Sequence, residues 1–430
     1  MKMTKAFELD RQFSWHPFTQ MSEWCGDGEE VLILTRGQGA WLEDEQGQRY
    51  LDGNSSIWTN LHGHGHPRLR EALLTQFDQV EHVSYLGTGN VPASFLAKEL
   101  IDLWEPGAFG RIFFSDNGTT AIEVALKMVI QYWQLVGQPE RTQILAFENA
   151  YHGDTMGAAS LGGVSLFQGR FDHYRFPVRH LSGLEELATV QDPHQVAAVF
   201  IEPGVQGVNE MRLWSEGMLA ALRAWCDQYG VKLIADEVMT GFGRSGHMFA
   251  SQKEGVIPDF VAVAKGLTGG VMPLAATFIR EEIFNAFLGT FEEQKTFYYG
   301  HSYTANPLGC AVARANLRIF QEENVLERLQ GHIQCLQGAL QQLQENSPWV
   351  YQVRQYGFIA GIEIRDTNGK RFPVEKRVAR KVCLAARRHQ LLTRPVAGDV
   401  IILMLPYCVT PDEIQLAANA INQAAQEVLE

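Results

Sequence analysis

Two short apolar stretches, LIADE at residues 233–237 and FVAVAK at residues 260–265, decide the fold. Each is a continuous apolar run that ends in charged side chains. Buried parallel strands have this pattern because helices cover both of their faces. Residues 111–114 and 196–201 form apolar runs of the same kind, and helical patterns alternate with strands from about residue 93 onward. The sequence therefore predicts an α/β fold with a mostly parallel sheet covered by helices.

The two ends of the chain predict a second, smaller domain. Short strands are expected at residues 31–34 and 48–51, where turn signals separate apolar stretches. The chain should end in an amphipathic helix that begins at Pro411, and no Pro/Gly/Ser-rich linker divides it into independent units. We expect three segments, which are the N-terminal part of a small α+β domain (residues 1–60), a large domain (residues 61–310) and the C-terminal part of the small domain (residues 311–430).

Composition excludes several classes of function. The chain has 430 residues, with 36 Lys and Arg against 49 Asp and Glu, and its formal net charge is −13. No Lys/Arg-rich stripe stands out, which argues against nucleic acid and anionic membranes as partners. No segment reaches the roughly 18 uninterrupted apolar residues of a membrane span. The six cysteines form no CxxC pair, so we expect neither a zinc site nor disulfides, and a reducing cytoplasm fits.

Polar groups follow the predicted strands at the sheet edge where open α/β folds bind ligands. Asp236 ends one strand and Lys265 follows the next, so an acid and an amine should project from the same edge. Residues 115–119, SDNGT, lead into a helix whose first-turn N–H groups can hold a phosphate. Each feature alone also fits an ordinary N-cap or ion pair. Together they favour pyridoxal phosphate (PLP), with an acid at its ring nitrogen and a lysine as anchor and proton carrier.

Longer motifs resemble the class III aminotransferase signature. The resemblance is carried by LIADEVMTGFGR at residues 233–244 and AKGLTGG at residues 264–270. It extends over nearly the whole chain, and WHPFT (residues 15–19), YHGDT (residues 151–155) and IEP (residues 201–203) are similar to the branch of the family that acts in biotin biosynthesis. The resemblance implies a fold-type I PLP-dependent transferase that forms a homodimer with active sites at the subunit interface.

The resemblance also assigns roles to individual residues. Lys265 would carry PLP as a Schiff base, Asp236 would keep the ring nitrogen protonated, and Tyr151 would stack on the ring. The phosphate would be held by Asn117, Gly118, Thr119 and Ser302 of the partner subunit. The substrate would be bound by Phe18, Ile57, Trp58, Gly300 and Arg394, with the arginine receiving a carboxylate. Without the resemblance, Tyr151, Ser302 and Arg394 also fit a core aromatic, a turn residue and a surface ion pair.

Two Gly-rich segments resemble a metal site and a dinucleotide-binding loop, but we expect neither function. His62, His64 and His66 would face one side of an extended segment, as metal ligands do. No carboxylate or cysteine lies beside them in the sequence, and Gly-rich loops are ordinary turns, so we expect no metal. GTGN at residues 87–90 lacks the third glycine and the preceding strand of a dinucleotide fingerprint.

The expected reaction is transfer of an amino group to 8-amino-7-oxononanoate, with lysine or S-adenosylmethionine as donor. Phe18 and Ile57 stand where the common form of this branch has tyrosine and tryptophan, and His301-Ser302 stands in place of Pro-Thr. Phe18 and Ile57 lack the hydroxyl and the indole of that tyrosine and tryptophan, and this loss favours lysine as donor. Three alternatives remain: an ω-amino acid (4-aminobutyrate-type) aminotransferase, an aminomutase on the same fold, and a non-enzymatic binding module. The Asp236–Lys265 pair argues against the last.

Overall fold

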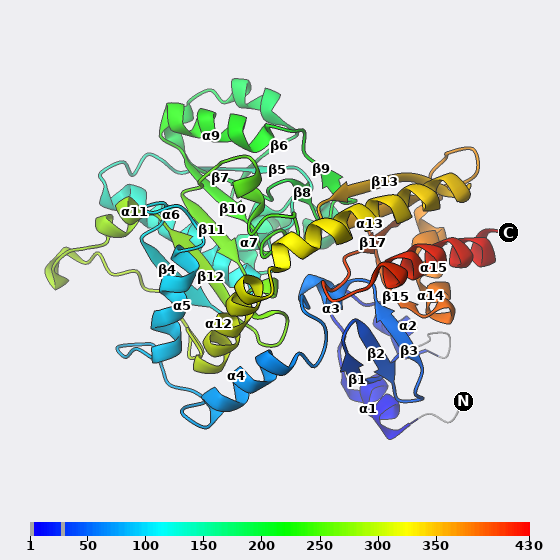
Figure 1. Cartoon of the computed structure of the whole chain (residues 1–430). Coiled ribbons are helices and arrows are strands. Elements are labelled where there is room, and N and C mark those ends of the chain that lie inside the picture. The colour runs from blue at the N-terminus through cyan, green and yellow to red at the C-terminus, as the bar shows by residue number, and fades with distance from the viewer. Residues whose placement is uncertain (1–3, 27–30) are drawn as a thin grey trace.

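A seven-stranded sheet forms the centre of the larger part of the molecule (Figure 1). The computed structural model describes residues 4–26 and 31–430. The strand order is β4-β12-β11-β10-β7-β5-β6. In this sheet β12 runs in the opposite direction to the other six strands. The strands are β4 (Arg111–Ser115), β5 (Gln143–Phe147), β6 (Arg179–Leu181), β7 (Val196–Ile201), β10 (Lys232–Asp236), β11 (Phe260–Val263) and β12 (Ala275–Ile279). The predicted α/β class is confirmed. The four strands expected at residues 111–114, 196–201, 231–235 and 260–264 form within one residue of these bounds.

Helices cover both faces of this sheet, which explains the continuous apolar runs. On β10, Leu233 packs in a core with α9 (Met218–Tyr229), whereas Ile234 packs in a separate core with α6 (Gly118–Leu135). Successive side chains of a strand point to opposite faces, so both faces need apolar residues. Both side chains are fully buried.

The two ends of the chain build a smaller α+β part together. β1 (Leu34–Gln38), β2 (Trp41–Asp44) and β3 (Arg49–Asp52) form a sheet whose fourth strand is the C-terminal β15 (Leu391–Leu392). A second sheet and its helices come from the C-terminal end alone and contain β13 (Val350–Tyr356), β14 (Ile359–Ile364), β16 (Pro395–Val396), β17 (Val400–Leu403), α14 (Val378–Ala386) and α15 (Pro411–Leu429). This confirms a small part built from both ends, and the helix predicted from Pro411 is present.

Two long helices lead from the central sheet to the smaller part. These are α12 (Pro307–Glu322) and α13 (Val325–Asn346), and Figure 1 shows α13 passing alongside α15. The domain boundary that we expected at residue 310 falls inside α12, so the division into domains stays a prediction. The remaining elements are α1 (Lys5–Phe13), α2 (Met21–Trp24), α3 (Ser55–Trp58), α4 (Pro67–Phe77), α5 (Val91–Ile101), α7 (Met156–Leu161), α8 (Ser165–Gln168), α10 (Ala250–Lys253), α11 (Glu281–Ala286), β8 (Val205–Gln206) and β9 (Arg212–Leu213).

One strand prediction was wrong in position. The strand expected at residues 31–34 begins only at Leu34 and continues to Gln38. The tight connection to β2 contains Gly39, whose φ of +55° lies in the left-handed region, and it pairs Gln38 with Trp41. The turn therefore sets the register, and of the apolar residues before Leu34 only Ile33 continues the pairing, since its carbonyl accepts from the Glu45 amide at 2.9 Å.

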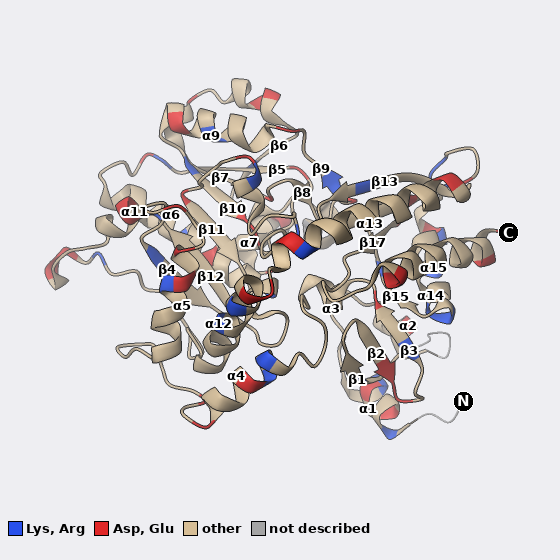
Figure 2. Cartoon of the chain, in the orientation of Figure 1, with Lys and Arg blue, Asp and Glu red and all other residues tan. Residues whose placement is uncertain are grey.

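Charged residues are interspersed over both parts of the molecule (Figure 2). Both signs of charge occur in each part of the described chain. Within residues 4–26 and 31–430, no helix is both long and apolar enough to cross a membrane.

Candidate active site

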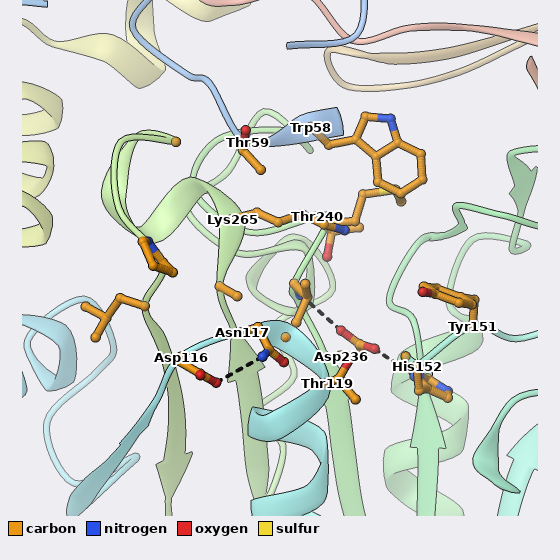
Figure 3. Close-up of a pocket in the computed structure, with 18 of the residues that line it drawn as sticks. Trp58, Thr59, Asp116, Asn117, Thr119, Tyr151, His152, Asp236, Thr240 and Lys265 are labelled. Atoms are coloured by element: carbon orange, nitrogen blue, oxygen red, sulfur yellow. Dashed lines mark hydrogen bonds and ion pairs between the residues drawn. The ribbon is translucent and has the colours of Figure 1, made fainter. Parts of the chain in front are cut away.

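A cavity of about 430 Å³ opens at the carboxyl edge of the central sheet (Figure 3). Asp236 is the last residue of β10, and Lys265 follows the neighbouring parallel strand β11. The N-terminus of α6 borders the cavity below these side chains, and Trp58 of α3 closes the opposite side. The strand-end argument therefore correctly placed the acid and the amine at one site.

The amine of Lys265 lies inside this cavity without an ion-pair partner in the described part of the chain. Its Nζ lies 4.6 Å from the centre of the Trp58 ring, and its backbone has a left-handed φ of +43°. Burial, which disfavours the charged form, lowers the pKa of Lys265 to about 8. Roughly one tenth of the amine is therefore uncharged at pH 7, and this neutral form is the nucleophile.

Asp236 is held by a histidine that sequence reasoning missed. His152 Nδ1 donates to Asp236 Oδ2 at 2.7 Å, and the Val238 amide donates to Oδ1 at 3.1 Å. Burial opposes the charged form of His152, but its hydrogen bond to Asp236 prevails and raises the pKa of the histidine. Asp236 thus pairs with His152 and not with Lys265, so the simple Asp236–Lys265 ion pair that the sequence also allowed does not form. The motif YHGDT contained the signal, because His152 directly follows Tyr151.

The start of α6 presents a closely packed backbone to the cavity. Asn117 caps the helix, because its Oδ1 accepts from the Thr120 amide at 3.0 Å. A Cβ on Gly118 would lie 2.6 Å from Val238, and one on Gly153 would lie 2.1 Å from Thr119 Oγ1. These glycines let the backbone approach closely, and the first-turn amides with the helix dipole make this end of α6 suited to an anion.

Tyr151 is anchored from behind by a second missed residue, Glu202. The amides of Tyr151 and Gly207 donate to the two carboxylate oxygens of Glu202 at 3.1 and 2.9 Å. Burial raises the pKa of Glu202 to about 7. The Tyr151 hydroxyl donates to Asp154 at 2.6 Å. Glu202 directly follows β7, so the strand-end rule that identified Asp236 could have identified it too.

A second cavity of about 630 Å³ brings together three predicted substrate residues, Phe18, Ile57 and Arg394. Ile57 precedes Trp58, so α3 contributes adjacent residues to the two cavities. The Phe167 ring meets the edge of Phe18 at 5.2 Å and that of Tyr151 at 6.1 Å between ring centres. The second cavity is thus linked to the first through α3 and through this aromatic contact.

Gly300 and Ser302 lie outside both cavities. They belong to an exposed segment before α12. Within this segment, His301 Nε2 lies 3.8 Å from Asp116 Oδ1, close to the start of α6. The single chain therefore does not bring Ser302 to its own cofactor cavity, and its role in a partner's site stays a prediction.

The three glycine-spaced histidines have separate partners. His62 bonds to Asn316 at 2.7 Å and His64 to Asp52 at 2.9 Å, while His66 lies 4.0 Å from Glu323. Among the residues that the structure describes, no group of three or more His, Cys, Asp or Glu side chains is arranged to hold a metal ion.

Comparison with known proteins decides the family. The family model described as "Aminotransferase class-III" matches residues 25–425. The chain belongs to the class III aminotransferases. An adenosylmethionine-8-amino-7-oxononanoate aminotransferase of Geobacter sulfurreducens is 42% identical over 98% of this chain and 97% of that protein. The crystal structure of the enzyme of the same name from Methanocaldococcus jannaschii matches with a TM-score of 0.94 and 38% identity, over 99% of both chains. A thermostable (S)-enantioselective ω-transaminase from Thermomicrobium roseum matches with a TM-score of 0.92 and 32% identity, over 100% of both chains.

Class III aminotransferases are PLP-dependent enzymes, and the cavity fits this cofactor. The unpaired amine of Lys265 suits the aldehyde, the carboxylate of Asp236 suits a protonated ring nitrogen, and the amides at the start of α6 suit the phosphate. Side chains at Gly118 or Gly153 would clash with the lining of this site. The chemistry of the cavity therefore agrees with the family assignment.

Proposed function

We propose that this aminotransferase transfers an amino group to 8-amino-7-oxononanoate and forms 7,8-diaminononanoate for biotin synthesis. The observation that carries the proposal is the position of Arg394, Phe18 and Ile57 in a cavity beside the one that contains Lys265. An acceptor with a reacting carbonyl, an apolar chain and a distal carboxylate matches this order of groups. Relatives named for this acceptor support the assignment.

Lys265 and Asp236 perform the central chemistry in this proposal. When bound, PLP supplies an aldehyde that takes up and releases the amino group, and a ring that accepts electrons. Asp236 holds a proton on the ring nitrogen, and its hydrogen bond with His152 keeps the carboxylate oriented. Lys265 anchors the aldehyde and then moves the proton at the reacting carbon of the substrate. Tyr151 would face the ring, and Asn117, Gly118 and Thr119, which line the same cavity, would hold the phosphate.

The acceptor lies across the two cavities. Its carboxylate binds Arg394 through charge-assisted hydrogen bonds, because a guanidinium matches a carboxylate in geometry and charge. Its apolar chain runs along Ile57 and Trp58 toward Lys265. Phe18 covers this chain from the N-terminal segment.

S-adenosylmethionine is the donor that we propose. The relatives carry adenosylmethionine in their names, and this outweighs the expectation of lysine that Phe18 and Ile57 raised. The change from tyrosine to Phe18 removes a hydroxyl without removing the aromatic face on which a cationic donor can rest.

The donor and acceptor half-reactions test the proposal directly. Purified enzyme is mixed with S-adenosylmethionine, lysine or 4-aminobutyrate, and loss of the aldehyde form is followed by absorbance. We expect S-adenosylmethionine to convert the cofactor to its amine form and 8-amino-7-oxononanoate to restore the aldehyde. Failure of 8-amino-7-oxononanoate to restore it would refute the synthase assignment. Conversion by 4-aminobutyrate would favour the ω-amino acid alternative, and turnover without an added donor would favour an aminomutase.

We also propose a cytoplasmic homodimer in which Ser302 of the partner subunit completes the phosphate site. Tyr298 and Tyr303 lie on either side of Ser302 in the sequence, and their side chains are 72% and 61% exposed. A second subunit would cover large exposed rings of this kind. Mixed dimers of a Lys265→Ala chain and a Ser302→Asp chain test the arrangement. If Ser302 acts across the interface, one site of each mixed dimer is intact and about half of the activity returns. If Ser302 acts within its own chain, the mixed dimer stays as impaired as its parents.

A further inference from the structure

Asn316, a fully buried residue of α12, connects the lysine segment to the histidine-rich loop. Its Nδ2 donates to the carbonyl oxygens of Gly266 and Leu267, both at 3.0 Å. Its Oδ1 accepts from His62 Nε2 at 2.7 Å. An asparagine in the middle of a helix is unfavourable for the helix itself, so these three bonds give a reason for its presence there.

The segment that Asn316 binds needs external support. Lys265 adopts a left-handed φ of +43°, and a residue that is not glycine keeps such a backbone only where its surroundings enforce it. The segment continues as a single short turn from Lys265 to Thr268. Its bonds include those from the Leu267 amide to the Ala264 carbonyl at 2.8 Å and from the Gly269 amide to the Gly266 carbonyl at 3.0 Å. Asn316 adds two bonds to the carbonyls directly after the strained residue.

His62 fixes which way the Asn316 amide points. Both hydrogens of the Asn316 amide are used by the two carbonyls, so its oxygen must face a donor, and His62 supplies Nε2–H. Burial lowers the pKa of His62 to about 4, so the ring is neutral at pH 7 and carries a single N–H. The rings of Phe320 and Tyr407 meet it at 5.3 and 6.4 Å between centres. The ring is therefore held in place on several sides.

We propose that Asn316, oriented by His62, is a positioning residue that fixes the backbone of residues 265–267 so that the Lys265 amine points into the cofactor cavity. The inference rests on the proposed role of Lys265 as the PLP anchor. It also gives a function to one of the three glycine-spaced histidines, which have separate side-chain partners in this structure. Neither Asn316 nor His62 lines the cofactor cavity, so both act through Lys265.

Two variants and one control isolate this role. Asn316→Asp keeps the size of the side chain and removes the two N–H donors. His62→Phe keeps a ring between Phe320 and Tyr407 and removes only the donor to Asn316. Leu317→Ala is the control, because Leu317 is also buried on the same helix but its side chain makes no hydrogen bond to the lysine segment.

The measurement is the rate at which each apo-protein incorporates PLP, followed by absorbance and by borohydride trapping with peptide mapping. Thermal unfolding of each apo-protein is recorded in parallel. We expect Asn316→Asp to slow incorporation at least about tenfold and His62→Phe about threefold or more, since displacing a reacting group by about 1 Å can cost about 100-fold. Leu317→Ala should lower the unfolding temperature and leave the rate within about twofold, because packing alone does not orient the amine.

Each outcome has a distinct meaning. Normal incorporation in both polar variants, or equal slowing in Leu317→Ala, overturns the inference and leaves the proposed function intact. A trapped pyridoxyl group on a lysine other than Lys265 in the unaltered protein refutes the anchor assignment itself. If Asn316→Asp does not fold, His62→Phe decides the question alone.

Discussion

The two cavities differ in how the chain builds them. Apart from Trp58 and Thr59, the cofactor cavity is lined by residues between 116 and 274, at the edge of the central sheet. The second cavity is lined by residues from the stretches 17–24, 34–57 and 377–395, near the two chain ends. The sheet edge holds the groups that all members of a PLP family need, whereas loops and chain ends can vary with the substrate. Changes in the first cavity should therefore affect chemistry, and changes in the second should affect binding.

The largest expected effect is that of Lys265→Ala. The change removes both the anchor and the proton carrier, and we expect turnover to fall by at least about 10⁴-fold, the upper range for acid–base catalysis by one group. Borohydride trapping in the unaltered enzyme should place the pyridoxyl group on Lys265. Lys127→Ala and Lys253→Ala are controls, since these amines lie over Tyr299 and Tyr356. A label on either would place the cofactor elsewhere.

Asp236→Asn should have the next largest effect. An amide cannot hold a proton on the ring nitrogen, so we expect the single-turnover rate to fall about 10²- to 10³-fold, as when one electrostatic stabiliser is removed. The cofactor should still bind, because the lysine and the start of α6 are unchanged. Stopped-flow absorbance measures the rate and equilibrium titration measures binding. An unchanged single-turnover rate would mean that the ring is oriented differently.

The two cavities also differ in how much of each could be predicted from the sequence. Asp236 and Lys265 were accessible because each directly follows an apolar strand, and strand ends meet at one edge. The motif YHGDT placed His152 beside Tyr151, but its contact with Asp236 was not accessible, because that contact spans 84 positions in the chain. Asn316 was hidden for the same reason, since its partner His62 lies 254 positions away. The start of β1 was misplaced because an apolar pattern does not reveal the register that a turn imposes. The second cavity depended on resemblance, since no periodicity brings Phe18 and Arg394 together.

The pH dependence of cofactor uptake should report the environment of Lys265. Burial lowers the pKa of Lys265 from 10.5 to about 8, and only the neutral amine adds to an aldehyde. The rate at which apo-protein incorporates PLP should therefore rise with pH and level off above about pH 8. At pH 7 the neutral fraction is roughly 300-fold larger than for an ordinary lysine, because each pKa unit is a factor of ten. Nα-acetyl-lysine serves as the reference amine, and a protein rate that still climbs at about pH 10 would contradict a lowered pKa.

Arg394→Ala should give the smallest of these effects and should confine it to binding. Loss of a charge-assisted hydrogen bond costs about 1.5–3 kcal/mol, so the KM for 8-amino-7-oxononanoate should rise about 10- to 150-fold. The value of kcat should change little, because Arg394 does not line the cofactor cavity. Half-reaction kinetics with acceptor and donor separate the two substrates, and with S-adenosylmethionine as donor only the acceptor step should weaken.

Arg377→Ala provides a matched control for this change. Arg377 lines the same cavity but already pairs with Glu23 at 2.6 Å, and an exposed pair of this kind contributes at most about 1 kcal/mol. Its loss should therefore move the acceptor KM by no more than a few-fold. Arg394→Lys should recover only part of the affinity, since an ammonium keeps the charge but cannot form the paired contact of a guanidinium. Equal effects of Arg377→Ala and Arg394→Ala would show that the cavity attracts the acceptor by its overall positive charge. A fall in kcat with Arg394→Ala would instead place this arginine in the chemistry, and the division between the two cavities would fail.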